Sequence, residues 1–119
     1  MKRPHHQLRV WNEALELAAQ VYAYTAGLPE QERFGLQSQM RRAAVSVPSN
    51  IAEGAARGTT PDYLRMLRIA RGSLAELETQ LRLCQQLHGL DCPEQLPESL
   101  DSVFLKLNSL IKTLQEKSK

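Results

Sequence analysis

Arginines are the residues of this chain whose type and spacing could do chemistry. Seven of them lie between positions 33 and 71, against the two acids Glu53 and Asp62, so this stretch has a local net charge of +5, although the whole chain has only +2. A guanidinium group can donate two parallel hydrogen bonds to one phosphate. The sequence therefore predicts a localised face that binds nucleic acid. Its candidate residues are Arg41, Arg42, Arg57, Arg65, Arg68 and Arg71.

The spacing of three of these arginines predicts how such a face would bind nucleic acid. Arg65, Arg68 and Arg71 recur every third residue, which forms a slowly rotating stripe along one side of a helix. Only Tyr63 lies close to them in the sequence, so stacking of bases on aromatic rings is not expected. The remaining mode is binding to the phosphate backbone, with low sequence specificity.

The same arginines have a second interpretation. They could pair with acids of neighbouring helices or subunits, because the rest of the chain carries eleven acids against eight bases. The protein would then be an interaction scaffold whose exposed face binds another protein, such as an enzyme encoded nearby. Salt distinguishes the two, since phosphate contacts weaken steeply with salt and an apolar interface does not.

Polar residues between positions 46 and 76 form a second candidate set. Pro48 lacks an N–H group and crowds the carbonyl of the preceding turn, so polar neighbours are needed to bond the groups that it frees. No histidine lies nearby to act as a base, and a nucleophile without a base is a poor catalyst, so no enzyme activity is expected. A structural polar network is predicted instead, made of Ser46, Asn50, Glu53, Ser73 and Glu76.

Metal and cofactor sites are not expected. The three histidines and two cysteines have neither the Glu-x-x-His pattern of di-metal bundles nor a zinc spacing, and no phosphate-binding glycine loop occurs. No apolar run follows the first residues, and none reaches the roughly 18 residues of a membrane span. We therefore expect a cytoplasmic protein with reduced thiols that does not contact a membrane.

Helices must position all of these residues. Apolar residues alternate at three and four residues in four segments, 7–26, 30–57, 61–88 and 97–115, with Gly or Pro between them. The pattern predicts one all-α domain over residues 1–119, an up-down-up-down antiparallel four-helix bundle with loose tails at 1–6 and 116–119. The second helix should kink near Pro48, and Gly72 should permit close approach of another backbone, the favoured interpretation, or of a ligand.

The first helix offers two adjacent apolar stripes. Its main seam is predicted to be Leu8, Trp11, Leu15, Ala18 and Tyr22, and the residues that widen it are Val10, Ala14, Leu17 and Val21. This is more apolar surface than one small bundle needs, which indicates self-association.

Three runs carry a resemblance to a known family. They are QSQMRRAAVSVPSNIAEGAARG at 37–58, IARGSLAELETQL at 69–81 and LRVWNEALELAAQVYAYT at 8–25. The chain resembles the four-helix-bundle proteins encoded by intervening sequences of bacterial 23S ribosomal RNA genes, themselves similar to the accessory protein of diversity-generating retroelements. The likeness fades after about residue 90. It implies a small all-α bundle, a ring-like homopentamer and binding of nucleic acid, with RNA favoured.

Overall fold

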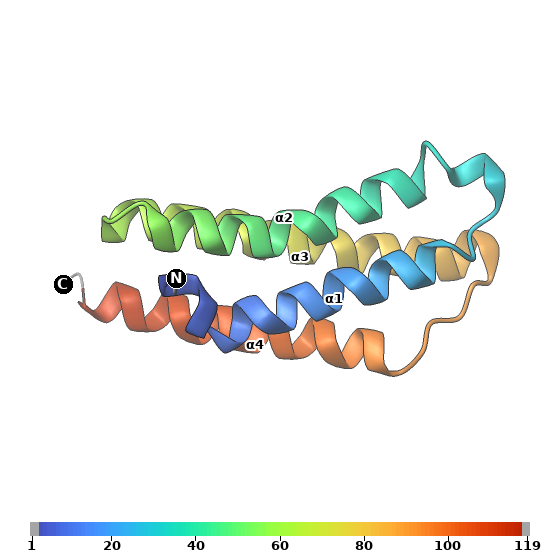
Figure 1. The fold of residues 1–119 in the computed structure, drawn as a ribbon. Helices are drawn as coiled ribbons and strands as arrows, with labels where there is room; N and C mark the ends of the chain where they lie inside the picture. The colour runs from blue at the N-terminus through green and yellow to red at the C-terminus, as the bar shows by residue number, and fades with distance from the viewer. Residues whose placement is uncertain (1–2, 118–119) are drawn as a thin grey trace.

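The computed structural model describes residues 3–117 and has four α-helices there. They are α1 (Arg9–Thr25), α2 (Leu36–Ala56), α3 (Thr60–His88) and α4 (Gln95–Lys117), with short 3-10 helices η1 (Pro4–Gln7) and η2 (Glu30–Glu32). No strand occurs among the described residues, so the prediction of an all-α four-helix protein is confirmed. Figure 1 shows the helices side by side in an elongated body, each running back along the one before it.

Helical segments extend into the predicted loose tails at 1–6 and 116–119, as far as the described residues reach. Residues 4–7 form η1, in which Pro4 fixes the backbone at the start and His5 packs on Trp11 with ring centroids 4.8 Å apart. At the other end, α4 continues through Glu116 to Lys117. Positions 1–2 and 118–119 of the predicted tails lie outside the described residues.

Helix α2 runs through Pro48 without a break, and Pro48 itself is buried. A helix that stops at this proline is therefore excluded, while the expected kink stays a prediction. The helix also begins later than the sequence pattern indicated, because residues 30–35 form η2 and a turn that ends at Gly35. Asn50, on the turn after the proline, donates a side-chain hydrogen bond to the Ser46 carbonyl at 2.7 Å.

The core follows the predicted helical pattern on α2, α3 and α4 but not on α1. The buried stripe of α1 contains Val10, Ala14, Leu17 and Val21, whereas the predicted seam residues Leu15 and Tyr22 are 43% and 44% exposed. Both stripes satisfy the helical period equally well. Only the position of the neighbouring helices decides which stripe faces inward, and a single helix pattern does not contain that information.

Glycine allows a close helix approach at Gly54, not at Gly72 as predicted. A β-carbon at position 54 would lie 3.0 Å from Cβ of Met66 and 3.0 Å from Cδ1 of Tyr63, so α2 and α3 touch through this glycine. A β-carbon at position 72 would meet no described atom within 4 Å. Gly54 is buried and Gly72 is exposed, which the sequence alone did not distinguish.

Alanine substitutions at the two glycines should therefore have opposite effects. We expect Gly54→Ala to lower the free energy of unfolding, because overpacking strain of about 1–3 kcal/mol outweighs a helix-propensity gain of up to about 1 kcal/mol. Gly72→Ala is the matched control and should be stabilising by about 0.5–1 kcal/mol. Urea denaturation of both variants is the measurement. Equal stabilisation by both would show that the helices have room to separate at Gly54.

Candidate nucleic-acid interface

Helix α3 holds the arginine stripe in a well-defined frame. Its N-terminus is capped by Thr59, whose side chain accepts a hydrogen bond from the backbone N–H of Asp62 at 3.3 Å, and Pro61 occupies the first turn. Its C-terminus is closed by Gly89, which adopts the left-handed φ of 61°. Both ends are thus satisfied locally, so the spacing of the arginines is set by one continuous helix.

Arg65 and Arg68 are exposed and, among the described residues, have no hydrogen-bond or ion-pair partner. Arg71 differs from them, because it is half-buried and its Nη1 donates to Oδ1 of Asn108 on α4 at 3.1 Å. The three arginines of the predicted stripe therefore lie on one helix, but the third, Arg71, is hydrogen-bonded to the neighbouring helix. Two guanidinium groups remain for a ligand from solvent.

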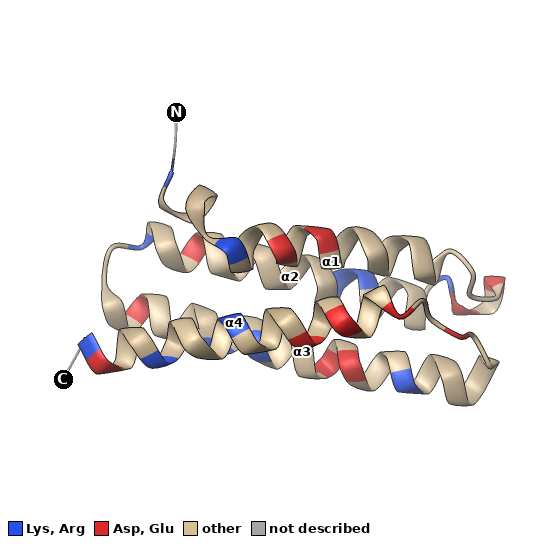
Figure 2. Ribbon diagram, turned by 90° about the horizontal axis from the view of Figure 1, so that it is seen from below, with Lys and Arg blue, Asp and Glu red and all other residues tan. Residues whose placement is uncertain are grey.

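Charges are segregated along the α3 and α4 side of the molecule. Figure 2 shows that the lysine and arginine segments of these two helices concentrate toward the end that carries the C-terminus. Acidic segments of the same helices concentrate in the other half. This side therefore offers an anion a basic half rather than a uniform mixture of charges.

Two of the three arginines at positions 41, 42 and 57 are already bonded within the chain. Nε of Arg41 donates to Oγ1 of Thr25 at 2.9 Å, and its Nη2 donates to the Tyr22 carbonyl at 3.2 Å, so α1 holds this side chain in place. Arg57 pairs with Glu53 at 3.3 Å on its own helix. Arg42 is exposed and has no partner among residues 3–117. Of the six candidates, Arg42, Arg65 and Arg68 are therefore the most available.

The predicted polar network is only partly assembled. The hydroxyl groups of Ser46 and Ser73 lie 2.8 Å apart between α2 and α3, and Nδ2 of Asn50 donates to Oγ of Ser46 at 2.9 Å. Glu76 instead accepts a hydrogen bond from Gln80, and Glu53 pairs with Arg57. The centre of the network thus joins three of the five residues across the helix interface.

A second hollow, of about 420 Å³, opens over this network. It is lined by Gln39, Arg42, Ala43, Ser46, Ser73 and Glu76. Glu76 therefore lies beside the network without bonding to the two serines.

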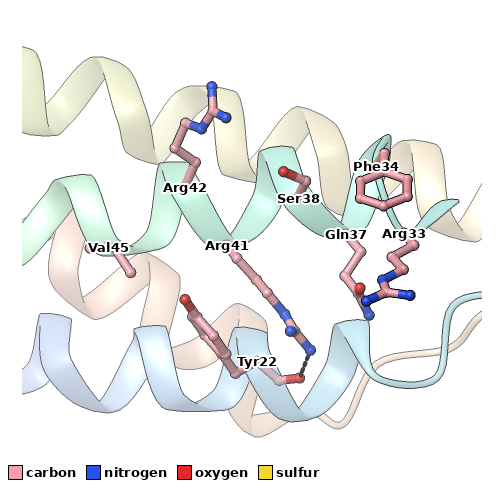
Figure 3. Close-up of a pocket in the computed structure, with 8 residues that line it drawn as sticks. All are labelled: Tyr22, Arg33, Phe34, Gln37, Ser38, Arg41, Arg42 and Val45. Carbon is pink, nitrogen blue, oxygen red and sulfur yellow. Dashed lines mark hydrogen bonds between the residues drawn. The ribbon is translucent and has the colours of Figure 1, made fainter.

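Aromatic side chains approach the α2 arginines from elsewhere in the chain, which sequence spacing did not show. Tyr22 on α1 and Phe34 before α2 line a hollow of about 480 Å³ together with Arg33, Gln37, Ser38, Arg41, Arg42 and Val45 (Figure 3). The Arg41 guanidinium lies 4.5 Å from the centroid of the Tyr22 ring. The signal available in the sequence was an aromatic residue, Phe34, inside a polar turn.

Glu32 fixes the turn that carries Phe34. One carboxylate oxygen accepts a hydrogen bond from the N–H of Leu36 at 3.1 Å, at the start of α2, and the other lies 2.6 Å from Nε2 of His88 at the end of α3. A β-carbon at position 35 would lie only 2.6 Å from the first oxygen, so a larger residue there would displace this carboxylate. The bonds from His88 and the Leu36 N–H lower the pKa of Glu32 below its usual value.

Two further features concern the part of the chain that the structure describes. No three His, Cys, Asp or Glu side chains gather there in a way that could hold a metal ion. None of the helices within residues 3–117 combines the length and the apolar character needed to cross a membrane.

Comparison with known families gives a match over nearly the whole chain. The model of the family described as "23S rRNA-intervening sequence protein" matches residues 6–116. No curated protein matches the chain. The further likeness to the accessory protein of diversity-generating retroelements stays a prediction.

The Ser46–Asn50–Ser73 cluster should contribute to stability. Asn50→Ala removes the donor to both the carbonyl and the hydroxyl of Ser46, and we expect it to lower the free energy of unfolding by about 1 kcal/mol. Ser49→Ala is the matched control, because Ser49 is exposed on the same turn and its substitution gains similar helix propensity. Thermal denaturation of both variants is the measurement. Equal melting temperatures would show that the Asn50 side chain does not contribute to stability.

The Glu32 contacts should make stability depend on pH. A carboxyl group whose pKa is lowered by folding stabilises the native state above its unfolded pKa, and this contribution disappears as the pH falls through the folded pKa. Wild-type protein should therefore lose more stability below about pH 4.5, the reference value for this group, than Glu32→Gln does. Urea denaturation between pH 7 and pH 3 measures the difference. Parallel pH curves for the two proteins would contradict the assignment.

Proposed function

The chain belongs to the 23S rRNA-intervening sequence protein family, and from the arginines that it exposes we propose that it binds the phosphate backbone of RNA in the cytoplasm. The observation that carries the proposal is the pair Arg65 and Arg68 on α3. Both side chains are exposed and, within residues 3–117, neither is engaged by a carboxylate. A phosphate can therefore bind them without first breaking an ion pair.

The geometry favours recognition of backbone charge over recognition of base sequence. Arg65 and Arg68 project from one helix about 4.5 Å apart along its axis, at a rise of about 1.5 Å per residue. A pair of guanidinium groups contacts phosphates in any sequence and fixes the position of the strand without reading its bases. We therefore expect similar affinity for different sequences and a steep dependence on salt.

Self-association would multiply these few contacts. Large apolar side chains remain exposed on several helices, among them Leu87 on α3 at 63% and Leu105 on α4 at 69%. Exposed apolar patches commonly mark interfaces, and the family resemblance favours five copies in a ring. Repetition of the Arg65–Arg68 pair in such a ring would raise the avidity for a long RNA without any new contact.

The alternative proposal is a protein interaction scaffold. In that case Arg65 and Arg68 would pair with acids of another subunit, and the exposed apolar side chains would bind a different protein. The pairs Arg57–Glu53 and Arg33–Glu30 show that other arginines of this chain do engage carboxylates. Assembly and RNA binding therefore have to be measured on the same variants.

The double variant Arg65→Ala with Arg68→Ala should weaken RNA binding to a similar extent for all sequences. The slope of log affinity against log salt should become shallower by about 0.7–0.9 for each phosphate that the variant no longer binds. Fluorescence anisotropy at several salt concentrations measures both quantities. Stability should change little, because exposed arginines contribute under about 1 kcal/mol.

Arg82→Ala is the control, since Arg82 is exposed on the same helix but further along it. Normal RNA binding by the double variant would show that Arg65 and Arg68 are not the binding site. Dissociation of the double variant into monomers, seen by light scattering, would favour the scaffold.

A further inference from the structure

We propose that the hollow between α1 and the start of α2 is a second RNA site, which binds one unstacked nucleotide of a single strand. Phe34 stacks on the base, and the arginines of the hollow bind the phosphate. This inference rests on the proposed RNA binding and deepens it, because it names the kind of RNA strand that binds at a site separate from the α3 arginines.

The lining of the hollow is basic. It contains Arg33, Arg41 and Arg42 and no acidic side chain. Arg33 pairs with Glu30 at 3.6 Å and Glu32 pairs with His88 at 2.6 Å, so Arg41 and Arg42 are the lining arginines that no acid engages among the described residues. Gln37 and Ser38, in the first turn of α2, complete the polar part of the lining. The guanidinium groups are therefore the donors that attract a phosphate to the hollow.

The arginines of the hollow have different roles. Arg41 is fixed by hydrogen bonds to Thr25 and Tyr22 and lies over the Tyr22 ring, so its charge is held in one place. Arg42 points away from it across α2 and is free to move toward a ligand (Figure 3). The fixed charge of Arg41 would attract an anionic ligand from solvent, and the guanidinium of Arg42, unpaired among the described residues, could then donate hydrogen bonds to it.

Phe34 adds an exposed aromatic ring, which a site for a purely anionic ligand would not require. Its side chain is 86% exposed, although a large apolar ring is normally buried. Arg33 lies 5.4 Å from the ring centroid, and the turn that carries the ring is held by Glu32 and Gly35. The ring is thus presented to solvent by an ordered turn, next to three arginines. An aromatic platform beside phosphate donors matches the chemistry of a nucleotide.

The strand type follows from the accessibility of the base. In a duplex both faces of a base are covered by its neighbours, so an aromatic side chain cannot stack on it without unstacking the helix. A single strand offers the face of the base at little cost. The hollow is widely open to solvent, with a volume of about 480 Å³, so a nucleotide of a single strand can reach it from outside.

The test compares a 12-nucleotide single-stranded RNA with a 12-base-pair RNA duplex, at the same salt concentration, by fluorescence anisotropy. Phe34→Leu keeps the apolar bulk but removes the aromatic ring. We expect it to weaken binding of the single strand about 5- to 150-fold, the range measured for loss of one stacked base, and to leave duplex binding unchanged. Leu105→Ala is the control, because Leu105 is also an exposed apolar residue but lies on α4.

Several outcomes would overturn the inference. They are unchanged binding of the single strand by Phe34→Leu, an equal loss for both RNAs, or a change in oligomer mass, which would make Phe34 a contact between copies. Competition by polyglutamate that is as strong as competition by unlabelled single strand would indicate an acidic protein segment instead.

A separate measurement keeps this site distinguishable from the α3 site. Adenosine monophosphate, adenosine and inorganic phosphate are titrated individually into wild-type protein, and amide NMR shifts of residues 34–42 are recorded. We expect larger shifts with the monophosphate than with either part alone, even if no long RNA binds and the proposed function fails. Absence of shifts with the monophosphate would overturn the inference while leaving the α3 proposal intact.

Discussion

The close contact of α2 with α3 at Gly54 is the constraint on which the rest of the arrangement depends. With no β-carbon at this position, the backbone of α2 approaches Tyr63 and Met66 directly. The same approach brings Ser46 within hydrogen-bond distance of Ser73 further along the interface. On α3, Leu67, Ala70 and Leu74 face the core, while Arg65 and Arg68 face solvent. A wider separation of these helices would break the bond between the two serines.

The sequence predicted the fold class because four amphipathic segments separated by Gly and Pro have few other ways to bury their apolar faces. Within the apolar segment predicted at 30–57, Leu36, Met40, Val47 and Ile51 are buried on α2. The sequence misassigned the inner stripe of α1, because two neighbouring stripes there have the same period. It placed the close approach at Gly72 rather than Gly54, since the choice between two glycines depends on which helix lies opposite each of them.

The candidate site shows the same division between local and long-range information. The spacing of Arg65, Arg68 and Arg71 follows from one helix, so their relative placement could be predicted correctly. The bond of Arg71 to Asn108 and the capture of Arg41 by Tyr22 and Thr25 join residues that are far apart in the sequence. The hollow around Phe34 could not be anticipated for the same reason, because it is formed by α1, a turn and α2 together. Residue type and local spacing thus indicated which residues carry charge, but not which of these side chains are already bonded to other parts of the chain.

Arg42 lies on the ridge between the two hollows, since it lines both the one around Phe34 and the one over Ser46 and Ser73. A ligand that draws this guanidinium group fully into one hollow withdraws it from the other. Ligands that each require it would therefore bind with negative cooperativity, because whichever binds first withdraws a donor from the other. This antagonism is reciprocal by thermodynamic linkage, so one exposed side chain makes occupancy of the α1–α2 hollow sensitive to a ligand in the hollow over Ser46 and Ser73.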